Sequence, residues 1–207
     1  MSVKRSLAFA LAAVAGLVAS PALAQGTHVK IYGGAAYVAP LSEDNITVGS
    51  VTDSVKAEQQ VGWNLGAEVR LGKLIGLELD YINATQDVKV GGATFGSTTF
   101  SPFTGTVNFH LLHSTLIDLY LGPSYSYVNW GDLELNQQGQ AFFGSSGLGT
   151  DSESAWGAAV GLDVGIGKHF AITGGLRYLD LKLQASSGGQ SVAVNPLIGR
   201  LGVAVRF

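Results

Sequence analysis

Apolar positions alternate with polar or small ones through the stretch from Asn195 to Phe207. Successive side chains of a strand point to opposite faces, so this stretch predicts a strand with one apolar face and one face that carries Arg200 and Arg206. The same alternation recurs in seven earlier stretches. The eight predicted strands cover residues 29–37, 61–71, 77–82, 103–111, 117–127, 156–166, 170–178 and 195–207. No Asp, Glu, Lys or Arg falls on any of the eight apolar faces.

The predicted connections alternate in length. Tight turns are expected near residues 72, 114 and 167, and longer Gly- and Ser-rich loops at about 40–58, 86–100, 130–153 and 184–192. Short turns at one rim, long loops at the other and an even strand number are typical of a bacterial outer-membrane barrel. We therefore predict an all-β fold, an eight-stranded antiparallel transmembrane up-and-down barrel with short periplasmic turns and long extracellular loops. The alternative is a soluble barrel, whose apolar faces would point inward.

Residues 1–24 have the features of a secretory signal peptide. Lys4 and Arg5 form a charged start, residues 7–18 an apolar run and residues 22–24 a cleavage site of small residues. The apolar run is shorter than the ~20 residues that a transmembrane helix needs. We expect residues 25–207 to form the barrel after export to the outer membrane of a Gram-negative bacterium.

Composition and charge narrow the possible functions. Only 13% of the residues are charged, whereas about a quarter are charged in a typical soluble domain. Removing Lys4 and Arg5 takes the balance from 12 basic against 15 acidic residues to 10 against 15, a net charge of −5. Such a chain lacks the basic stripe that nucleic acid requires, so we expect no nucleic-acid partner. It has no cysteine, and no motif points to a cofactor.

Aromatic residues end the apolar faces at two heights. Near the long-loop rim lie Tyr37, Trp63, Tyr81, Phe103, Tyr125, Tyr127, Trp156 and Tyr178, and near the short-turn rim lie Phe109, Phe170 and Phe207. Amphipathic rings settle at the lipid headgroups, so the two sets predict a double interfacial belt.

The inward faces divide by height into a charged and an apolar part. Toward the short turns and mid-height lie five basic and five acidic residues: Lys30, Glu68, Arg70, Glu78, Asp80, Asp118, Asp163, Arg177, Arg200 and Arg206. Buried charges are tolerated when they are paired, so we interpret this lumen charge network as a structural floor rather than a catalytic or ion-conducting site. Toward the long loops the inward residues are Val38, Pro40, Ile82, Pro102, Val128, Leu179, Leu181, Leu183, Val194 and Ile198.

An apolar mouth above a charged floor does not suit an aqueous pore, whose lumen is polar throughout. It indicates a narrow funnel that admits small hydrophobic molecules. The alternative is that loop residues such as those at 141–143 (Ala-Phe-Phe) fold into this space as ordinary core.

A funnel that is closed below needs another exit. Pro102 lies early in the fourth predicted strand, and proline cannot donate a hydrogen bond to a sheet ladder. A missing pair between the third and fourth strands would open a lateral exit into the bilayer. The alternative is a proline tolerated at the rim, where pairing ends.

Several short motifs along the chain are typical of a known family. The clearest are residues 154–159 (Ser-Ala-Trp-Gly-Ala-Ala), 177–180 (Arg-Tyr-Leu-Asp), 195–196 (Asn-Pro) and 205–207 (Val-Arg-Phe), and weaker ones lie at 32–40, 76–79 and 120–123. In these motifs the chain resembles the OmpW family of small outer-membrane barrels. The resemblance implies an eight-stranded barrel, uptake of small hydrophobic compounds and a sideways exit into the bilayer. It also implies that Phe207 is the assembly signal read by the barrel-assembly machinery. Some family members have an aromatic residue where this chain has Arg177, which argues against a purely apolar gate.

No motif indicates enzymatic chemistry. His110 and His113 have a metal-like spacing, but strand residues three apart face opposite ways, so no metal site is predicted. Ser114, His113 and Asp118 are neighbours in sequence only, and a catalytic triad is defined by geometry. We expect a protein that is not an enzyme, although a lipid-modifying barrel enzyme is an alternative.

The long loops are acidic, which indicates a solvated face; the alternative is weak bridging to lipopolysaccharide through divalent cations. A structural or adhesive barrel, whose loops carry the function and whose lumen is inert, is the remaining class. For either class we expect the lipid bilayer and lipopolysaccharide as partners.

Overall fold

The computed structural model describes residues 27–41, 44–48, 51–57, 59–90, 93–131, 133–137, 140, 147–148, 152–183 and 192–207. The predicted signal peptide at 1–24 and the loop residues at 141–143 lie outside the described residues. In the described part of the chain no helical segment has the length and hydropathy to cross a bilayer.

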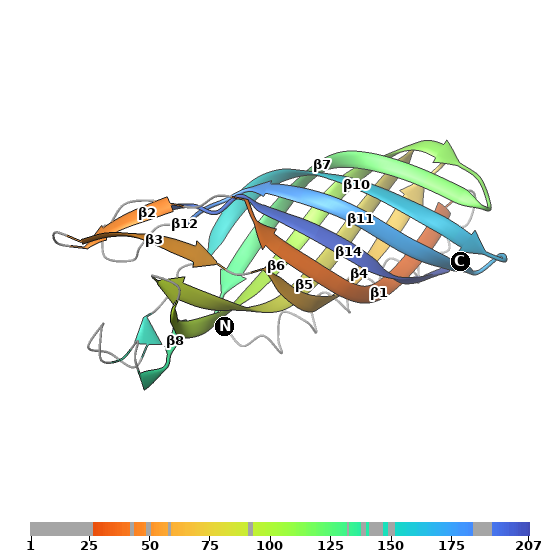
Figure 1. The fold of residues 1–207 in the computed structure, drawn as a ribbon. Coiled ribbons are helices and arrows are strands. Elements are labelled where there is room, and N and C mark those ends of the chain that lie inside the picture. The colour runs from red at the N-terminus through yellow and green to blue at the C-terminus, as the bar shows by residue number, and fades with distance from the viewer. Residues whose placement is uncertain are drawn as a thin grey trace.

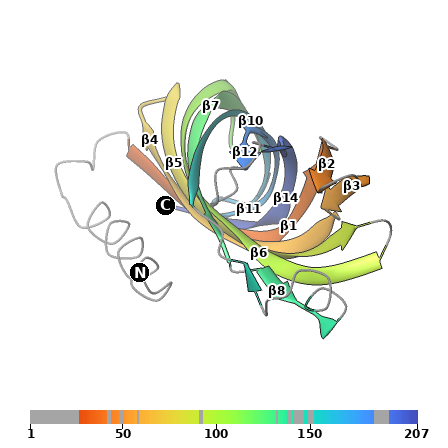
Figure 2. The same cartoon turned by 90° about the vertical axis from the view of Figure 1, so that its left-hand side faces the viewer.

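Eight long strands form a closed antiparallel barrel (Figure 1), and the view in Figure 2 shows the ring that they make around the lumen. They are β1 (Thr27–Pro40), β4 (Gln60–Leu71), β5 (Ile75–Val90), β6 (Ala93–His113), β7 (Ile117–Trp130), β10 (Glu153–Ile166), β11 (Phe170–Asp180) and β14 (Pro196–Arg206). Each pairs with the next in this order, and β14 closes the barrel by pairing with β1 from Arg206↔Lys30 to Pro196↔Pro40. The predicted fold is confirmed.

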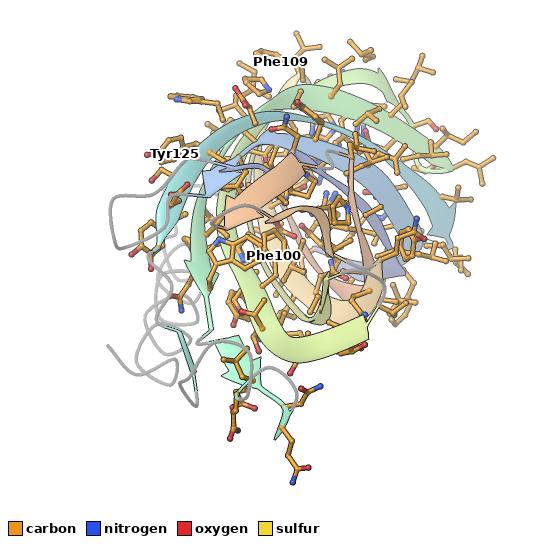
Figure 3. The ribbon with its side chains drawn as sticks, turned by 60° about the vertical axis from the view of Figure 1, so that its left-hand side comes forward. Phe100, Phe109 and Tyr125 are labelled. Carbon is orange, nitrogen blue, oxygen red and sulfur yellow. The ribbon has the colours of Figure 1, made fainter. Side chains whose placement is uncertain are left out.

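Side chains alternate between the lumen and the outer surface of the wall. Figure 3 shows Phe109 and Tyr125 pointing away from the barrel and Phe100 pointing into it. The residues predicted for the two aromatic belts lie on the outer surface, where Tyr37, Trp63, Phe103, Tyr125, Tyr127, Trp156, Tyr178, Phe109, Phe170 and Phe207 are exposed and Tyr81 is half-buried. The alternative of a soluble barrel is wrong, because the apolar faces point outward, as lipid contact requires.

Glycine sets two of the three short turns. Gly72 between β4 and β5 has φ 69°, and Gly167 between β10 and β11 has φ 72°, a left-handed conformation that side chains with a Cβ disfavour. In the third turn the Ser114 hydroxyl accepts hydrogen bonds from the backbone N–H groups of Leu116 (3.2 Å) and Ile117 (2.8 Å). Ser114 is therefore a turn residue.

The long-loop end contains more strand than the sequence predicts. The stretch 86–100 was expected to be a loop, but β5 and β6 stay paired from Ala84↔Phe100 to Val90↔Ala93. The remaining short strands at this end are β2 (Asp44–Val48), β3 (Val51–Ala57), β8 (Leu133–Leu135), β9 (Gly147–Leu148), β12 (Lys182–Leu183) and β13 (Val192–Ala193). The strands were predicted too short because the apolar face of each strand ends where the bilayer ends. The backbone hydrogen bonds of the ladder continue further, since they do not depend on apolar side chains.

Candidate functional site

The lower half of the lumen is filled by ion pairs. The members of the predicted lumen charge network that meet there are Lys30, Glu68, Arg70, Glu78, Asp80, Asp118, Asp163, Arg177 and Arg200, and each is at most 9% exposed. They come from seven of the eight barrel strands, because inward positions at similar height converge on a narrow axis. A water-filled channel would leave these side chains solvated, so the floor is closed.

Two arginines and two carboxylates form the upper layer of the floor. Arg177 on β11 pairs with Asp80 and, at 3.1 Å between Nη2 and Oε1, with Glu78 on β5. The Nη1 atom of Arg200 on β14 lies 2.9 Å from carboxylate oxygens of both acids. Arg177 also donates to the Thr106 hydroxyl at 3.2 Å. Each charge therefore has more than one partner, which is the arrangement that makes buried ion pairs tolerable.

Lys30 organises the layer below. Its Nζ atom lies 3.1 Å from Glu68 and 3.0 Å from Asp163, which are on opposite sides of the lumen. The Asn108 amide donates to Glu68 at 3.0 Å and to Glu78 at 3.1 Å. Asn108 thereby connects the two layers into one network.

Two tyrosines that the sequence analysis did not single out complete the floor. The Tyr32 hydroxyl accepts a hydrogen bond from Arg200 at 2.7 Å, and the Tyr120 ring lies 4.4 Å below the Lys30 ammonium. Each ring occupies space left by a glycine, since a Cβ on Gly66 would lie 2.4 Å from the Tyr32 ring and one on Gly161 would lie 2.3 Å from the Tyr120 ring. Both tyrosines fall at inward positions of the alternation. This position was the sequence feature that could have assigned them to the lumen.

The reasoning that excluded His110 and His113 from a shared site was wrong. The β6–β7 register shifts between His110 and Leu112, and such a bulge turns the following side chains by one position. Both histidines therefore contact Asp118, at 2.7 Å from the His110 Nδ1 atom and 3.3 Å from the His113 Nδ1 atom. The prediction that His113 and Asp118 are neighbours in sequence only was thus wrong as well. Arg70 completes the group through its own ion pair with Asp118. No cluster of three or more metal-ligating side chains is found among the described residues.

Arg206 is placed differently from its prediction. It is only half-buried, it lies at the short-turn rim, and its Nη2 atom donates to the backbone carbonyl of Phe170 at 3.2 Å. No acidic partner of Arg206 is found within the described ranges. The chain position explains this, because Arg206 is the last residue of β14 and extends beyond the layer of acids.

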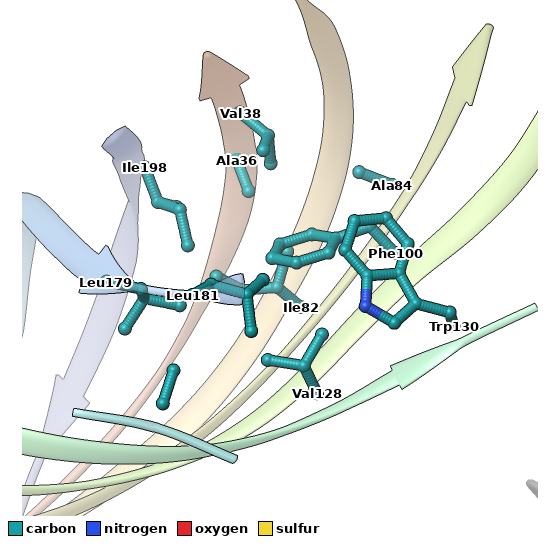
Figure 4. Close-up of a cluster of buried hydrophobic side chains, with 11 residues drawn as sticks. Ala36, Val38, Ile82, Ala84, Phe100, Val128, Trp130, Leu179, Leu181 and Ile198 are labelled. Atoms are coloured by element: carbon teal, nitrogen blue, oxygen red, sulfur yellow. The ribbon is translucent and has the colours of Figure 1, made fainter. Parts of the chain in front are cut away.

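The upper half of the lumen is an apolar cluster (Figure 4). We call this the upper apolar cluster; its members are Ala36, Val38, Ile82, Ala84, Phe100, Val128, Trp130, Ala155, Leu179, Leu181 and Ile198. Six of these were predicted to line the funnel. Phe100 and Trp130 were not, and their rings pack with centroids 4.9 Å apart.

The remaining predicted funnel residues lie around this cluster. Val194 and Pro102 are buried, Pro40 is half-buried, and the side chain of Leu183 lies outside the described residues. Val38, Ile82, Val128, Leu179, Leu181 and Ile198 are all 0% exposed. The upper lumen is therefore packed shut by its own side chains in this state.

Leu181 is the cluster member that comes from outside the barrel strands. It follows β11 directly, and its backbone carbonyl accepts a hydrogen bond from Val194 N at 2.9 Å. Its backbone N–H donates to the Asn195 side chain at 3.2 Å. Asn195 has φ 37°, in the left-handed region where asparagine is among the best tolerated residues. Leu181 is thus held over the lumen by a short clasp to the start of β14.

The β5–β6 ladder is interrupted at Pro102. Pairing runs to Tyr81↔Phe103 and resumes at Ala84↔Phe100 in the same register. The two strands stay adjacent across the gap, where the Asn83 amide donates to the Ser101 hydroxyl at 3.0 Å. The interruption is therefore local, and Pro102 is not at the end of the pairing.

Comparisons with solved structures agree with this architecture. OprG from Pseudomonas aeruginosa superposes with a TM-score of 0.76 at 19% identity, covering 88% of this chain and 96% of that chain. AlkL in DMPC lipid bilayers gives a TM-score of 0.60 at 15% identity, with coverage of 88% and 90%. The E. coli outer membrane protein W gives a TM-score of 0.56 at 20% identity, with coverage of 89% and 100%. At these identities the likeness shows the fold.

No curated protein matches the chain. The profile of the outer membrane protein beta-barrel domain family, by contrast, matches residues 10–207. Together with the OmpW-type fold, this match confirms the predicted resemblance and places the protein in the outer membrane, in contact with the lipid bilayer. The chain belongs to the outer membrane protein beta-barrel domain family.

Proposed function

We propose that the barrel admits small hydrophobic molecules from outside into the upper apolar cluster and releases them sideways into the bilayer. The observation that carries the proposal is the division of the lumen, with eleven apolar residues in one cluster above a closed ion-pair floor. A polar solute would lose its hydrogen bonds to water in the cluster without replacement, whereas an apolar one would not. The floor blocks direct passage to the periplasm.

Entry requires the cluster to open, and Leu181 is the side chain best placed to move. It is held by backbone and Asn195 contacts outside the barrel wall rather than by a strand ladder. The interrupted ladder at Pro102 lies at the height of the upper apolar cluster. Ile82 is the residue opposite Pro102 in the gap, and it belongs to the cluster. A solute that displaced Leu181 would therefore lie beside the weakest part of the β5–β6 wall.

An exported barrel implies further roles for the two ends of the chain and for the outer surface. We infer that residues 1–24 direct export, that Phe207 is read by the barrel-assembly machinery, and that the outer surface borders lipopolysaccharide. We further infer that the protein is not an enzyme; the engagement of the Ser114 hydroxyl in a turn supports this. A structural or adhesive barrel with an inert lumen is the second candidate, favoured by the complete burial of the upper apolar cluster.

Trp130 is a reporter that separates the two candidates. The chain has three tryptophans, and Trp63 and Trp156 face lipid whereas Trp130 is 7% exposed in the cluster. In a Trp63→Phe/Trp156→Phe background, a brominated short alkane should quench Trp130 fluorescence saturably. Leu181→Ala removes the side chain that closes the cluster, so quenching should saturate at about tenfold lower alkane concentration. This corresponds to a free energy of opening that is ~1.4 kcal/mol smaller.

The control for this experiment is Leu176→Ala, which truncates a leucine that faces lipid and is 51% exposed. It should leave the alkane dependence unchanged. If Trp130 is not quenched in either protein, or is quenched equally in both without saturation, the lumen is inert and the second candidate holds.

The lateral exit is tested by restoring the ladder. Pro102→Val supplies the missing N–H donor and keeps an apolar inward side chain, so uptake of a labelled hydrophobic solute by cells that express the variant should fall severalfold. Alkane quenching of Trp130 should persist, because entry is unaffected. Unchanged uptake at equal barrel abundance would remove the exit at Pro102 from the proposal.

A further inference from the structure

A cavity opens on the short-turn rim, at the end of the barrel opposite the upper apolar cluster. It measures about 200 Å³, and we call it the periplasmic vestibule. Its lining carries four permanently charged basic side chains, Lys30, Arg70, Lys168 and Arg206, but a single acidic side chain, Glu68. This balance is opposite to that of the whole chain, which has a formal net charge of −3. Like charges repel in a confined space, so the excess needs a counter-ion.

Two of the cations are already neutralised inside the barrel. Lys30 pairs with Glu68 and Asp163, and Arg70 pairs with Asp118. The charge that is left over therefore belongs to Lys168, in the turn between β10 and β11, and to Arg206.

Neither of these two residues has an acidic partner in the part of the chain that the structure describes. Arg206 reaches only a backbone carbonyl, and its Nε atom is buried without a hydrogen-bond acceptor. The Nε atom of Arg70, a residue that is 4% exposed, is also buried without an acceptor. A guanidinium offers five N–H donors, and leaving such a donor unsatisfied is costly. Lys168 and Arg206 therefore bring positive charge to the vestibule that no acidic side chain among the described residues neutralises.

The vestibule is held in shape by backbone contacts. The Arg206 N–H donates to the His169 carbonyl at 2.7 Å, and the His169 Nδ1 atom lies 3.3 Å from the Arg206 carbonyl. The turn that carries Lys168 is thereby docked on β14. On the other side the rings of His28 and His113 lie 6.2 Å apart. Three histidines therefore line the cavity as further N–H donors or acceptors.

We propose that the periplasmic vestibule binds a phosphate group. A phosphate presents several acceptor oxygens and negative charge in a compact volume, which matches the positive charge of Lys168 and Arg206, both in the lining of the vestibule. The group can be carried by free phosphate or by the headgroup of a phospholipid in the periplasmic leaflet. The site is independent of the upper apolar cluster, which lies on the far side of the ion-pair floor.

The four histidines of the chain provide the test. His28, His113 and His169 line the vestibule, and His110 is 3% exposed inside the barrel. With the histidines isotopically labelled, and the protein in phosphate-free maltoside micelles at fixed pH, inorganic phosphate should shift the first three imidazole signals saturably. The His110 signal should shift less than these three, because His110 does not line the vestibule. Sodium chloride at equal ionic strength should not reproduce the shifts.

Matched variants locate the effect. Lys168→Ala should weaken phosphate binding about three- to tenfold and Lys168→Ala/Arg206→Gln at least tenfold, the range expected when charged hydrogen bonds are lost. Lys73→Ala removes the exposed lysine of the other Gly-Lys turn, outside the vestibule, and should have no effect.

The source of the group is decided by a second titration. If phosphatidylglycerol added to the micelles produces the same shifts and competes with inorganic phosphate, the occupant is a headgroup; if it does not compete, the site takes free phosphate. Both results support the proposal. It is overturned if neither compound shifts the three signals, or if the shifts persist unchanged in Lys168→Ala/Arg206→Gln.

Discussion

Arg177→Met destabilises the barrel by about 3–5 kcal/mol, the usual cost of breaking a buried ion pair from one side. Arg177 is 0% exposed and neutralises Glu78 and Asp80, which are 2% and 1% exposed. Methionine fills part of the volume but supplies no donor, so among the described residues Arg200 is the one cation still paired with the two carboxylates. Equilibrium unfolding of the detergent-folded barrel in guanidinium, followed by tryptophan fluorescence, measures the loss.

Two further variants show whether charge is the cause. Lys168→Met removes an exposed cation and should change the unfolding free energy by less than about 0.5 kcal/mol, as is usual for surface substitutions. Adding Asp80→Asn to Arg177→Met removes one of the stranded charges, so the double variant should be less destabilised than the sum of the single ones. A wild-type stability for Arg177→Met would mean that the floor does not stabilise the barrel.

Leu201→Arg should cost about 2–4 kcal/mol of folding free energy in a bilayer, the penalty of an arginine on the lipid face at mid-depth. Leu201 is 64% exposed on the outer surface and is paired with Ala35 and Gly174 near the middle of their strands. The reference is Leu71→Arg, at the last residue of β4 beside the Gly72 turn, where the same change should cost only about 0–1 kcal/mol. Reversible folding into phospholipid vesicles measures both.

The difference between these two positions tests the orientation of the wall. Equal costs at Leu201 and Leu71 would contradict a membrane-spanning barrel, since a surface in water has no depth dependence. A cost at Leu201 that vanished in detergent but not in vesicles would instead support it.

The alternation along the chain determined the wall of the barrel. The side chain of every wall residue faces either lipid or the lumen. Which of the two it faces follows from the two-residue period of a strand, which is a local property. Leu201 and Arg200 could therefore be assigned to opposite faces without knowledge of any contact. The same argument placed Arg177 and Asp80 in the lumen at similar height. The alternation of apolar and polar residues ends where the wall leaves the bilayer. The sequence pattern therefore missed the paired extension of β5 and β6.

The tertiary structure alone decided which inward residues meet. Lys30 and Asp163 are 133 residues apart and Arg177 and Asp80 are 97 apart, and their pairing depends on the register of several successive ladders. The bulge after His110, which brings His113 to Asp118, is one inserted residue that no local period reveals. The closure of the upper lumen by Leu181 and the separation of Arg206 from the floor are likewise outcomes of where the strands end. Alternation specifies a face, whereas a contact across the barrel requires the ring to be closed.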